Sequence, residues 1–219
     1  MEFPQRHPGG PPFLQLASMN SDLAGPLALV LSYLIGSVDF AVVVARMHGV
    51  DIHEVGSGNP GATNVMRTLG RLPAAMVFIG DALKGVIAAA IGTYLTLADS
   101  AISLWAFAAG LAAVVGHCYP LYHRFRGGKG VATAAGVVFF TMPIVGLIQT
   151  VVWALVARIT RVASIASLTV VVLCIPLAIW QGVEGASLAL LGAILLLVAY
   201  RHRGNISRIL HRSEQKVSP

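Results

Sequence analysis

Two short polar segments carry the residue types that bind phosphate. The first, from Gly56 to Arg67, reads GSGNPGATNVMR, and the second, from Arg126 to Gly130, reads RGGKG. Glycines let the backbone approach an anion and point N–H groups at it, while hydroxyl, amide and cationic side chains add donors and charge. The two segments therefore indicate chemistry on phosphorylated molecules.

In the first segment, hydroxyl and amide side chains alternate with glycines, and an arginine follows one helical turn after the last amide. The candidate ligands are Ser57, Gly58, Asn59, Gly61, Thr63, Asn64 and Arg67. The alternative interpretation is a tight turn followed by a helix cap at Thr63 or Asn64. The two interpretations are compatible, because the N-terminus of a helix attracts anions.

In the second segment, Gly127, Gly128 and Gly130 surround Lys129 just before an apolar run. Backbone N–H groups there can cradle a phosphate while Lys129 neutralises its charge. The segment is not a Walker A loop, because that loop needs Ser or Thr directly after the lysine and Gly130 follows here. A flexible basic turn that anchors a helix to lipid headgroups is the alternative.

Further polar candidates lie inside or beside apolar runs. Asp81 and Lys84 are three residues apart, so an ion pair and a substrate-binding role for Lys84 both stay open. Ser164 follows a basic connection and is a candidate ligand. His202 and Asn205 are one helical turn apart, within a basic stripe that an interfacial helix would also show.

The elements that must position these residues are membrane helices. The 219 residues are 56% hydrophobic and 11% charged, with a mean hydropathy of +0.78 and a net charge of +6, which excludes an ordinary water-soluble domain. Apolar runs of helix length lie at residues 25–45, 72–97, 101–119, 131–157, 162–180 and 186–200. We expect one membrane domain over residues 23–214.

The two ends of the chain are predicted to lie outside this domain. Residues 1–22 lack the charged start and apolar core of a signal peptide and are predicted to form a disordered extension. Met19 stays open as an alternative to Met1 as the start. Residues 215–219 are interpreted as a tail.

The positions of the basic residues predict the topology. Arg and Lys collect in four segments, which follow the first, third and fourth runs and form the C-terminal region, while the other connections carry Asp99 and Glu184. Placing all four basic segments on the cytoplasmic side requires the run at 131–157 to turn back, and Met142-Pro143 can turn it. We therefore predict an all-α protein of seven transmembrane helices, the fourth and fifth short and paired, with the N-terminus outside and the C-terminus in the cytoplasm. A single long helix kinked at Pro143 is the alternative.

Four motifs, in order along residues 32–214, resemble those of the acyl-phosphate:glycerol-3-phosphate acyltransferase family. They are GSGNPGATN, DALKG for DxxKG, GHCYPLYHRFRGGKGVAT for GHxxPxxxxFxGGKGVAT, and RHRGNISR for RHxxNIxR. The resemblance implies a seven-helix bacterial inner-membrane enzyme whose active site faces the cytoplasm. It also implies transfer of a fatty acyl group from acyl phosphate to the 1-position hydroxyl of glycerol 3-phosphate, which releases lysophosphatidate and inorganic phosphate in the first acylation step of phospholipid synthesis. Neither acyl-CoA nor acyl-carrier protein is the direct donor in that family.

The resemblance also implies roles for individual residues. The candidate catalytic residues are Ser57, Arg67, Lys129, His202 and Asn205. Asn59, Thr63 and Asn64 resemble ligands of phosphate or acyl phosphate, Gly127, Gly128, Lys129 and Gly130 resemble the loop assigned to glycerol phosphate, Ser164 matches a further polar position, and Glu214 resembles a structural acidic residue. Two positions depart from the family pattern, because Asp39 stands where proline is usual and Arg212 where glycine is usual.

The chemistry of acyl phosphate agrees with this set of residues. Acyl phosphate is a mixed anhydride with a good leaving group, so an enzyme chiefly needs to neutralise two phosphates, align a hydroxyl with a carbonyl and exclude water. The base is either His202 or an oxygen of a substrate phosphate. No cluster of residues has metal-ligand spacing, so we expect no metal and no cofactor, and the expected partners are the two substrates and membrane lipid, without nucleic acid.

The main alternative function is transport of an anionic or phosphorylated solute. Broken helices with glycine-rich turns bind anions within transporters, but the sequence shows no inverted repeat. A non-catalytic scaffold would explain the apolar runs and none of the polar loops. Acyl-chain preference and oligomeric state stay open.

Overall fold

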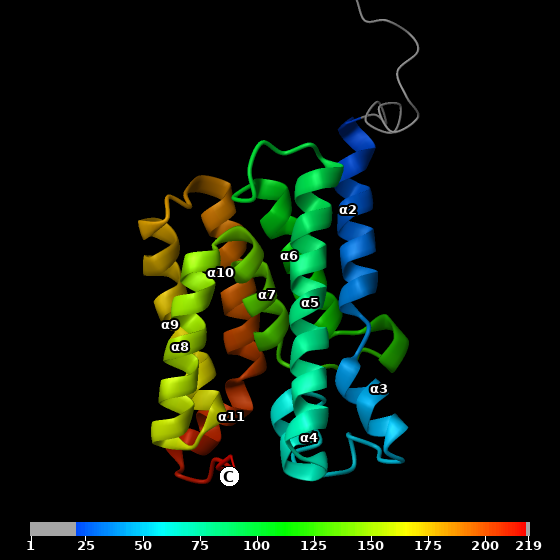
Figure 1. Cartoon of the computed structure of the whole chain (residues 1–219), viewed down its shortest axis with the longest axis vertical. Helices are drawn as coiled ribbons and strands as arrows, with labels where there is room; N and C mark the ends of the chain where they lie inside the picture. The colour runs from blue at the N-terminus through cyan, green and yellow to red at the C-terminus, as the bar shows by residue number, and fades with distance from the viewer. Residues whose placement is uncertain (1–20, 218–219) are drawn as a thin grey trace, which may run out of the picture.

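The structure, a computed structural model, describes residues 21–217, and every regular element in that part is helical, as predicted (Figure 1). The elements are α2 Ser21–Gly36, α3 Phe40–Met47, α4 Ala62–Leu69, α5 Arg71–Leu95, α6 Leu104–Cys118, the 3-10 helix η1 Leu121–His123, α7 Val131–Thr141, α8 Pro143–Thr160, α9 Ala163–Trp180, α10 Gly185–Arg201 and α11 Arg203–Leu210. Most of the N-terminal extension predicted to be disordered, residues 1–20, lies outside the described residues, and Ser21 already begins α2.

Within residues 21–217, five segments are long and apolar enough to cross a membrane. They are Leu23–Met47, which joins α2 and α3, Arg71–Leu95, Leu104–His123, Pro143–Thr160 and Ala163–Trp180. A sixth is added if α10 and α11, which meet at an angle of 54°, count as one span. The protein is therefore a multi-pass membrane protein, while the seven crossings and the orientation of the termini stay predictions.

The apolar run at 131–157 is divided where the sequence suggested. α7 ends at Thr141 and α8 begins at Pro143, where the missing N–H of proline costs no helical hydrogen bond. Figure 1 shows the two helices turning back on each other, so the single kinked helix is wrong. α7 is short, with 11 residues, but α8 has 18, which is longer than predicted because the helix continues through Arg158 to Thr160.

The first span is also broken, and Asp39 stabilises the break. Its carboxylate accepts hydrogen bonds from the backbone N–H groups of Ala41 and Val42, at 3.0 and 3.1 Å, and so caps α3. The aspartate that departs from the family pattern therefore supplies acceptors for two N–H groups that a proline side chain would leave unpaired.

Glycines allow α5 and α7 to pack in backbone contact. A Cβ atom on Gly136 would lie 1.9 Å from the carbonyl oxygen of Ala82, and one on Gly85 would lie 2.0 Å from the carbonyl oxygen of Thr133. Small residues at such interfaces are typical of membrane helices, where association depends on close packing. This contact fixes α7, and with it the loop that precedes α7, against the long helix α5.

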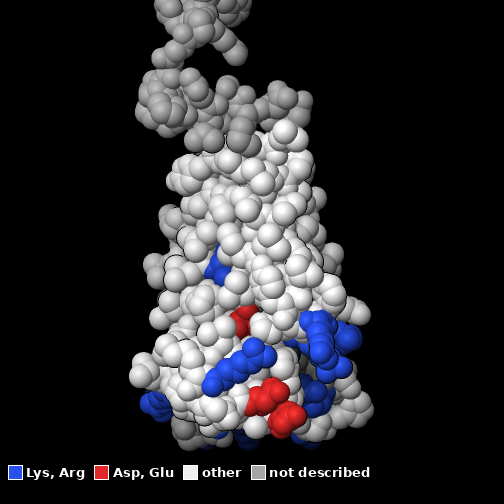
Figure 2. Space-filling view, turned by 90° about the vertical axis from the view of Figure 1, so that its right-hand side faces the viewer, with Lys and Arg blue, Asp and Glu red and all other residues white. Residues whose placement is uncertain are grey.

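Charged side chains gather at one end of the molecule. Figure 2 shows Lys, Arg, Asp and Glu concentrated toward one end of the face in view, while most of the rest of that face carries none. Figure 1 shows α4, α11 and the C-terminus at this end and the start of α2 at the opposite end. We refer to the end with α4 and α11 as the charged end.

Replacing Gly136 by alanine should destabilise the protein, because the new methyl group would overlap the backbone of α5. We expect a loss of about 1–3 kcal/mol, seen as a lower melting temperature of the purified protein in detergent. Gly192→Ala is the matched control, because no atom lies within 4 Å of its added Cβ. That change should leave stability unchanged or raise it by up to about 1 kcal/mol. Equal melting temperatures for the two variants would contradict the α5–α7 contact.

Candidate active site

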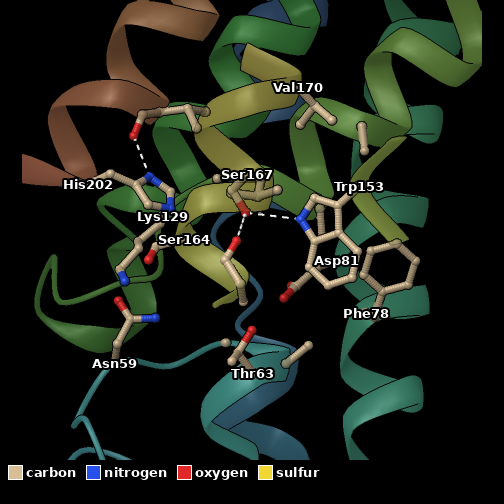
Figure 3. A pocket seen from close by; sticks show the side chains of 18 of the residues that line it. Asn59, Thr63, Phe78, Asp81, Lys129, Trp153, Ser164, Ser167, Val170 and His202 are labelled. Atoms are coloured by element: carbon tan, nitrogen blue, oxygen red, sulfur yellow. Dashed lines mark hydrogen bonds between the residues drawn. The ribbon is translucent and has the colours of Figure 1, made fainter. Parts of the chain in front are cut away.

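A cavity of about 800 Å³ opens near the charged end and extends between α5, α7, α8 and α9. Eleven of the residues singled out in the sequence line it, including all five candidate catalytic residues: Ser57, Asn59, Gly61, Thr63, Asn64, Arg67, Lys129, Gly130, Ser164, His202 and Asn205. Figure 3 shows Asn59 and Thr63 on one side of Lys129 and Ser164, with Trp153 and Val170 on the other. Four predicted site residues do not line the cavity, and they are Gly58, Lys84, Gly127 and Gly128.

Asn64 organises the first polar loop. Its side-chain oxygen accepts a hydrogen bond from the Ser57 N–H at 2.9 Å, and its amide nitrogen donates to the carbonyl oxygens of Val55 and Ile52 at 3.0 and 3.3 Å. The side chain is buried and both amide N–H groups are used. Asn64 therefore holds the loop that presents Ser57 and Asn59, which differs from the direct phosphate contact expected from the sequence.

Arg67 extends from α4 into the cavity, where its two terminal nitrogens hydrogen-bond to one residue of the C-terminal tail. They donate to the side-chain and backbone oxygens of Gln215, each at 3.0 Å. Its Nε is buried and has no hydrogen-bond partner among the described atoms. Burial lowers the pKa of Arg67 from its usual value, but an arginine stays charged at any physiological pH. The guanidinium is thus a cation suited to an anionic ligand.

The glycine-rich loop is held from behind by an arginine. Arg201, at the end of α10, donates to the carbonyl oxygens of Gly127 and Gly128 at 2.7 and 3.0 Å. A Cβ on Gly128 would lie 2.2 Å from Nε2 of His117, so only glycine allows this close approach. Gly127 and Gly128 therefore fix the position of the loop and do not face the cavity.

Lys129 is the residue of this loop that reaches into the cavity. Gly130 has φ +84°, a left-handed conformation that favours glycine, and directly precedes α7. Nζ of Lys129 donates to Oδ1 of Asn205 at 2.6 Å. Burial lowers the pKa of Lys129 to about 8, so the ammonium is still mostly protonated at neutral pH. The lysine is a partly desolvated cation beside Asn205.

Glu214 joins α9 and α11 beside this lysine. Its Oε1 accepts hydrogen bonds from the Ser164 hydroxyl, at 2.9 Å, and from the Asn205 amide, while Oε2 accepts from Nε of Arg208 at 2.7 Å. Burial raises the pKa of Glu214, but the hydrogen bonds outweigh it and hold the pKa below its usual value. The carboxylate orients Asn205, which in turn bonds to Lys129, and so it holds this part of the site in place.

The turn before Glu214 contains Arg212, the second residue that departs from the family pattern. Arg212 has φ +55°, in the left-handed region where a side chain costs about 1–2 kcal/mol. The glycine usual in the family would adopt this conformation without that cost. Arg212 is therefore tolerated with strain, and Glu214 still reaches Ser164 and Asn205.

His202 lies at the bend between α10 and α11 and is 2% exposed. Its Nδ1 lies 2.8 Å from the carbonyl oxygen of Val198, a contact visible in Figure 3. Because a carbonyl only accepts, Nδ1 carries a proton and Nε2 is left as the acceptor of the neutral ring. The geometry is that of an oriented proton acceptor at the edge of the cavity.

Lys84 has a structural environment. Its Nζ contacts Oδ1 of Asp81 at 2.8 Å, the carbonyl oxygen of Val38 at 2.7 Å and Nδ1 of His117 at 3.0 Å. These contacts use its three donors and join α5, α6 and the break between α2 and α3. Of the two interpretations left open by the sequence, the geometry favours the ion pair.

Several residues of the site were missed in the sequence. Arg201 was counted only as a topological charge and Gln215 as part of the tail. The apolar part of the cavity is lined by Phe78, Val138, Gly146, Trp153, Val170 and Val171, which look like ordinary membrane-helix residues in sequence. Within residues 21–217, no three His, Cys, Asp or Glu residues are placed to hold a metal ion.

A pair of partly buried cations at one end of an apolar cavity suits a membrane protein that acts on an amphiphile with an anionic head. A model of the glycerol-3-phosphate acyltransferase family matches residues 26–212. The chain belongs to this family.

Named relatives and solved structures agree with the family match. The glycerol-3-phosphate acyltransferase of Pseudomonas fluorescens strain Pf0-1 is 44% identical over 185 residues, which covers 82% of this chain and 93% of that protein. The protein of the same name from Cupriavidus metallidurans is 43% identical over 194 residues, covering 87% and 95%. The crystal structure of PlsY (YgiH), an integral membrane glycerol 3-phosphate acyltransferase, in its glycerol 3-phosphate form has a TM-score of 0.83 and 40% identity, covering 89% of this chain and 96% of that one.

Arg201→Ala should reduce acyltransferase activity by releasing the glycine-rich loop. Losing two hydrogen bonds from a charged group should lower kcat/KM about 10- to 100-fold, measured with purified protein. Arg203→Ala is the matched control, because Arg203 bonds to the carbonyl oxygen of Tyr200 and packs on its ring, away from the loop. Similar activity in both variants would show that the loop does not need Arg201.

Proposed function

We propose that the protein transfers a fatty acyl group from acyl phosphate to the 1-position hydroxyl of glycerol 3-phosphate. The products are lysophosphatidate and inorganic phosphate. The observation that carries this proposal is the presence of two cations, Arg67 and Lys129, at the charged end of a cavity whose other end is apolar. Its family membership supports glycerol 3-phosphate as the acceptor.

The two cations have separate environments, which suits two phosphate-bearing substrates. Lys129 and the backbone of Gly130 bind the phosphate of glycerol 3-phosphate in this proposal, beside Asn205. Arg67 binds the phosphate of the acyl donor, together with the polar side chains of the loop that Asn64 holds: Ser57, Asn59 and Thr63. Each phosphate is then paired with a fixed positive charge, which also stabilises the phosphate that leaves.

The reaction itself needs alignment and one proton transfer. The 1-hydroxyl oxygen attacks the carbonyl carbon, the bond from that carbon to the phosphate oxygen breaks, and phosphate leaves with the electron pair. The hydroxyl proton passes to Nε2 of His202 or to a phosphate oxygen of a substrate. Ser164, held by Glu214, lines the same part of the cavity and is available as a ligand.

The acyl chain lies in the apolar part of the cavity in this proposal. α5 and α8 contribute lining residues such as Phe78 and Trp153, yet these two helices do not pack closely against each other. Trp153 is held by a hydrogen bond from its Nε1 to the hydroxyl of Ser167 at 3.1 Å (Figure 3). Burial of a hydrocarbon chain beside these residues contributes about 0.8 kcal/mol per methylene group.

The proposal places the charged end in the cytoplasm of a bacterial inner membrane. The excess of Arg and Lys at this end agrees with the rule that basic residues stay on the cytoplasmic side. The described chain begins at one end of the molecule and finishes at the other, which agrees with an odd number of crossings such as seven (Figure 1). The N-terminus is then outside and both substrates are bound from the cytoplasmic side.

The deciding experiment gives purified protein acyl phosphate and labelled glycerol 3-phosphate and looks for labelled lysophosphatidate. Acyl-CoA is the control donor and should yield no product. Product formation from acyl-CoA alone would overturn the assignment of the donor. Flux of labelled solute into vesicles without any product would instead support the transporter alternative.

The lowered pKa of Lys129 predicts a pH dependence of substrate binding. Deprotonation removes the positive charge, so the KM for glycerol 3-phosphate should rise as the pH increases through about 8, approaching a rise of about tenfold per pH unit. The substrate itself stays a dianion in this range, because its second pKa is about 6. Lys129→Arg should abolish the rise, because arginine does not deprotonate. The same rise in both proteins would remove Lys129 as its cause.

A further inference from the structure

The C-terminal tail, residues Ser213 to Val217, contributes Glu214 and Gln215 to the lining of the cavity. Glu214 is fixed by three hydrogen bonds to Ser164, Asn205 and Arg208. Beyond it, the N–H of Val217 donates to the carbonyl oxygen of Arg161 at 2.7 Å, at the junction of α8 and α9. The tail is therefore held at Glu214 and again at Val217, on either side of Gln215.

Gln215 occupies the end of the Arg67 guanidinium. Its Oε1 and its backbone oxygen each lie 3.0 Å from one of the two terminal nitrogens of Arg67. Two oxygens facing the two terminal nitrogens of a guanidinium form the paired arrangement by which arginine binds carboxylate and phosphate. Phosphate and Gln215 therefore cannot both occupy this side of the Arg67 guanidinium at the same time.

We propose that Gln215 is a positioning residue that stands in for phosphate on Arg67 and is exchanged with phosphate in each catalytic cycle. This inference rests on the proposed function, in which Arg67 binds the phosphate of the acyl donor. When the donor arrives, its phosphate replaces the two oxygens of Gln215. After acyl transfer, Gln215 returns to Arg67 as inorganic phosphate dissociates, and its two oxygens then compete with the rebinding of phosphate.

The energetics favour exchange over a permanent contact. An arginine with unpaired N–H groups in a partly buried site is unfavourable, so a neutral acceptor stabilises the empty site. A phosphate dianion forms stronger, charge-assisted hydrogen bonds with the same nitrogens, so it displaces the neutral oxygens. Gln215 and Lys216 are exposed, so their movement disturbs no packed core. Glu214, with its three bonds, is the fixed point about which the last residues move.

The test compares the full chain with a chain that ends at Glu214. Deletion removes both oxygens of Gln215 from Arg67, so phosphate should bind more tightly. We expect the inhibition constant of inorganic phosphate and the KM for acyl phosphate both to fall about three- to tenfold, without a rise in kcat. The deletion also removes the positive charge of Lys216 and places a new terminal carboxylate on Glu214, and each change by itself would weaken anion binding, so a fall in both constants cannot come from the charges. Unchanged or higher constants in both the shortened chain and Gln215→Leu would overturn the proposal and indicate a fixed support for Arg67.

Two further variants keep the test decisive if the shortened chain folds poorly. Gln215→Leu retains the backbone oxygen and loses the side-chain acceptor, so it should show a smaller fall, of about two- to threefold. Lys216→Ala keeps both contacts to Arg67 and should show no fall. If Gln215→Leu matches Lys216→Ala in phosphate inhibition, the side chain of Gln215 does not compete with phosphate.

Direct binding of inorganic phosphate to the full and shortened chains, measured by calorimetry without turnover, separates this inference from the proposed function. Tighter binding to the shortened chain would support exchange at Arg67 even if the acyl donor were a different compound. Equal binding to both chains, together with normal turnover of acyl phosphate, would overturn the exchange and leave the proposed function standing.

Discussion

Under the proposed function, the site depends on keeping two cations at the boundary of a hydrocarbon environment while their anionic ligands come and go. A buried charge without partners is strongly unfavourable, so each cation needs polar contacts in the empty protein. Lys129 finds them in Asn205, which Glu214 orients, and Arg67 finds them in Gln215. The hydrogen bonds of Asn205 and Gln215 give both cations polar partners, and neither cation is bonded directly to a carboxylate in the described part of the chain.

Asn205 illustrates how an indirect contact satisfies this requirement. If a carboxylate were bonded directly to Lys129, phosphate could bind only by breaking an ion pair between two full charges. An amide oxygen between the carboxylate of Glu214 and the ammonium gives a weaker contact, which a phosphate can replace. The arrangement stabilises the lysine and leaves its charge available for binding.

The sequence was informative where the required residues are contiguous. Glycines, hydroxyls and a cation within short segments pointed to two loops whose residues line the cavity, and Pro143 identified the end of α7, because both signals are local. The sequence was less informative about the partners of those residues. Arg67 and Gln215 are 148 positions apart, and Arg201 and Gly127, which are also hydrogen-bonded, are 74 positions apart. Asn64 and Lys84 were predicted to be ligands because an amide and an ammonium can both bind phosphate. In the structure, their N–H groups instead bond to backbone and side-chain atoms that are distant in the sequence and that only the fold brings near.

The loose packing between α5 and α8 has a consequence for kinetics. In the proposed reaction, an acyl donor that enters between these two helices comes from the bilayer, and glycerol 3-phosphate comes from the water at the charged end. Under the proposed function, the reaction rate depends on the mole fraction of the amphiphilic donor in the bilayer and on the molar concentration of the small polar acceptor in the cytosol. Expanding the membrane with inert lipid at constant total donor would then slow the enzyme as dilution does in solution, while enlarging the aqueous volume at a fixed acceptor concentration would have no such effect.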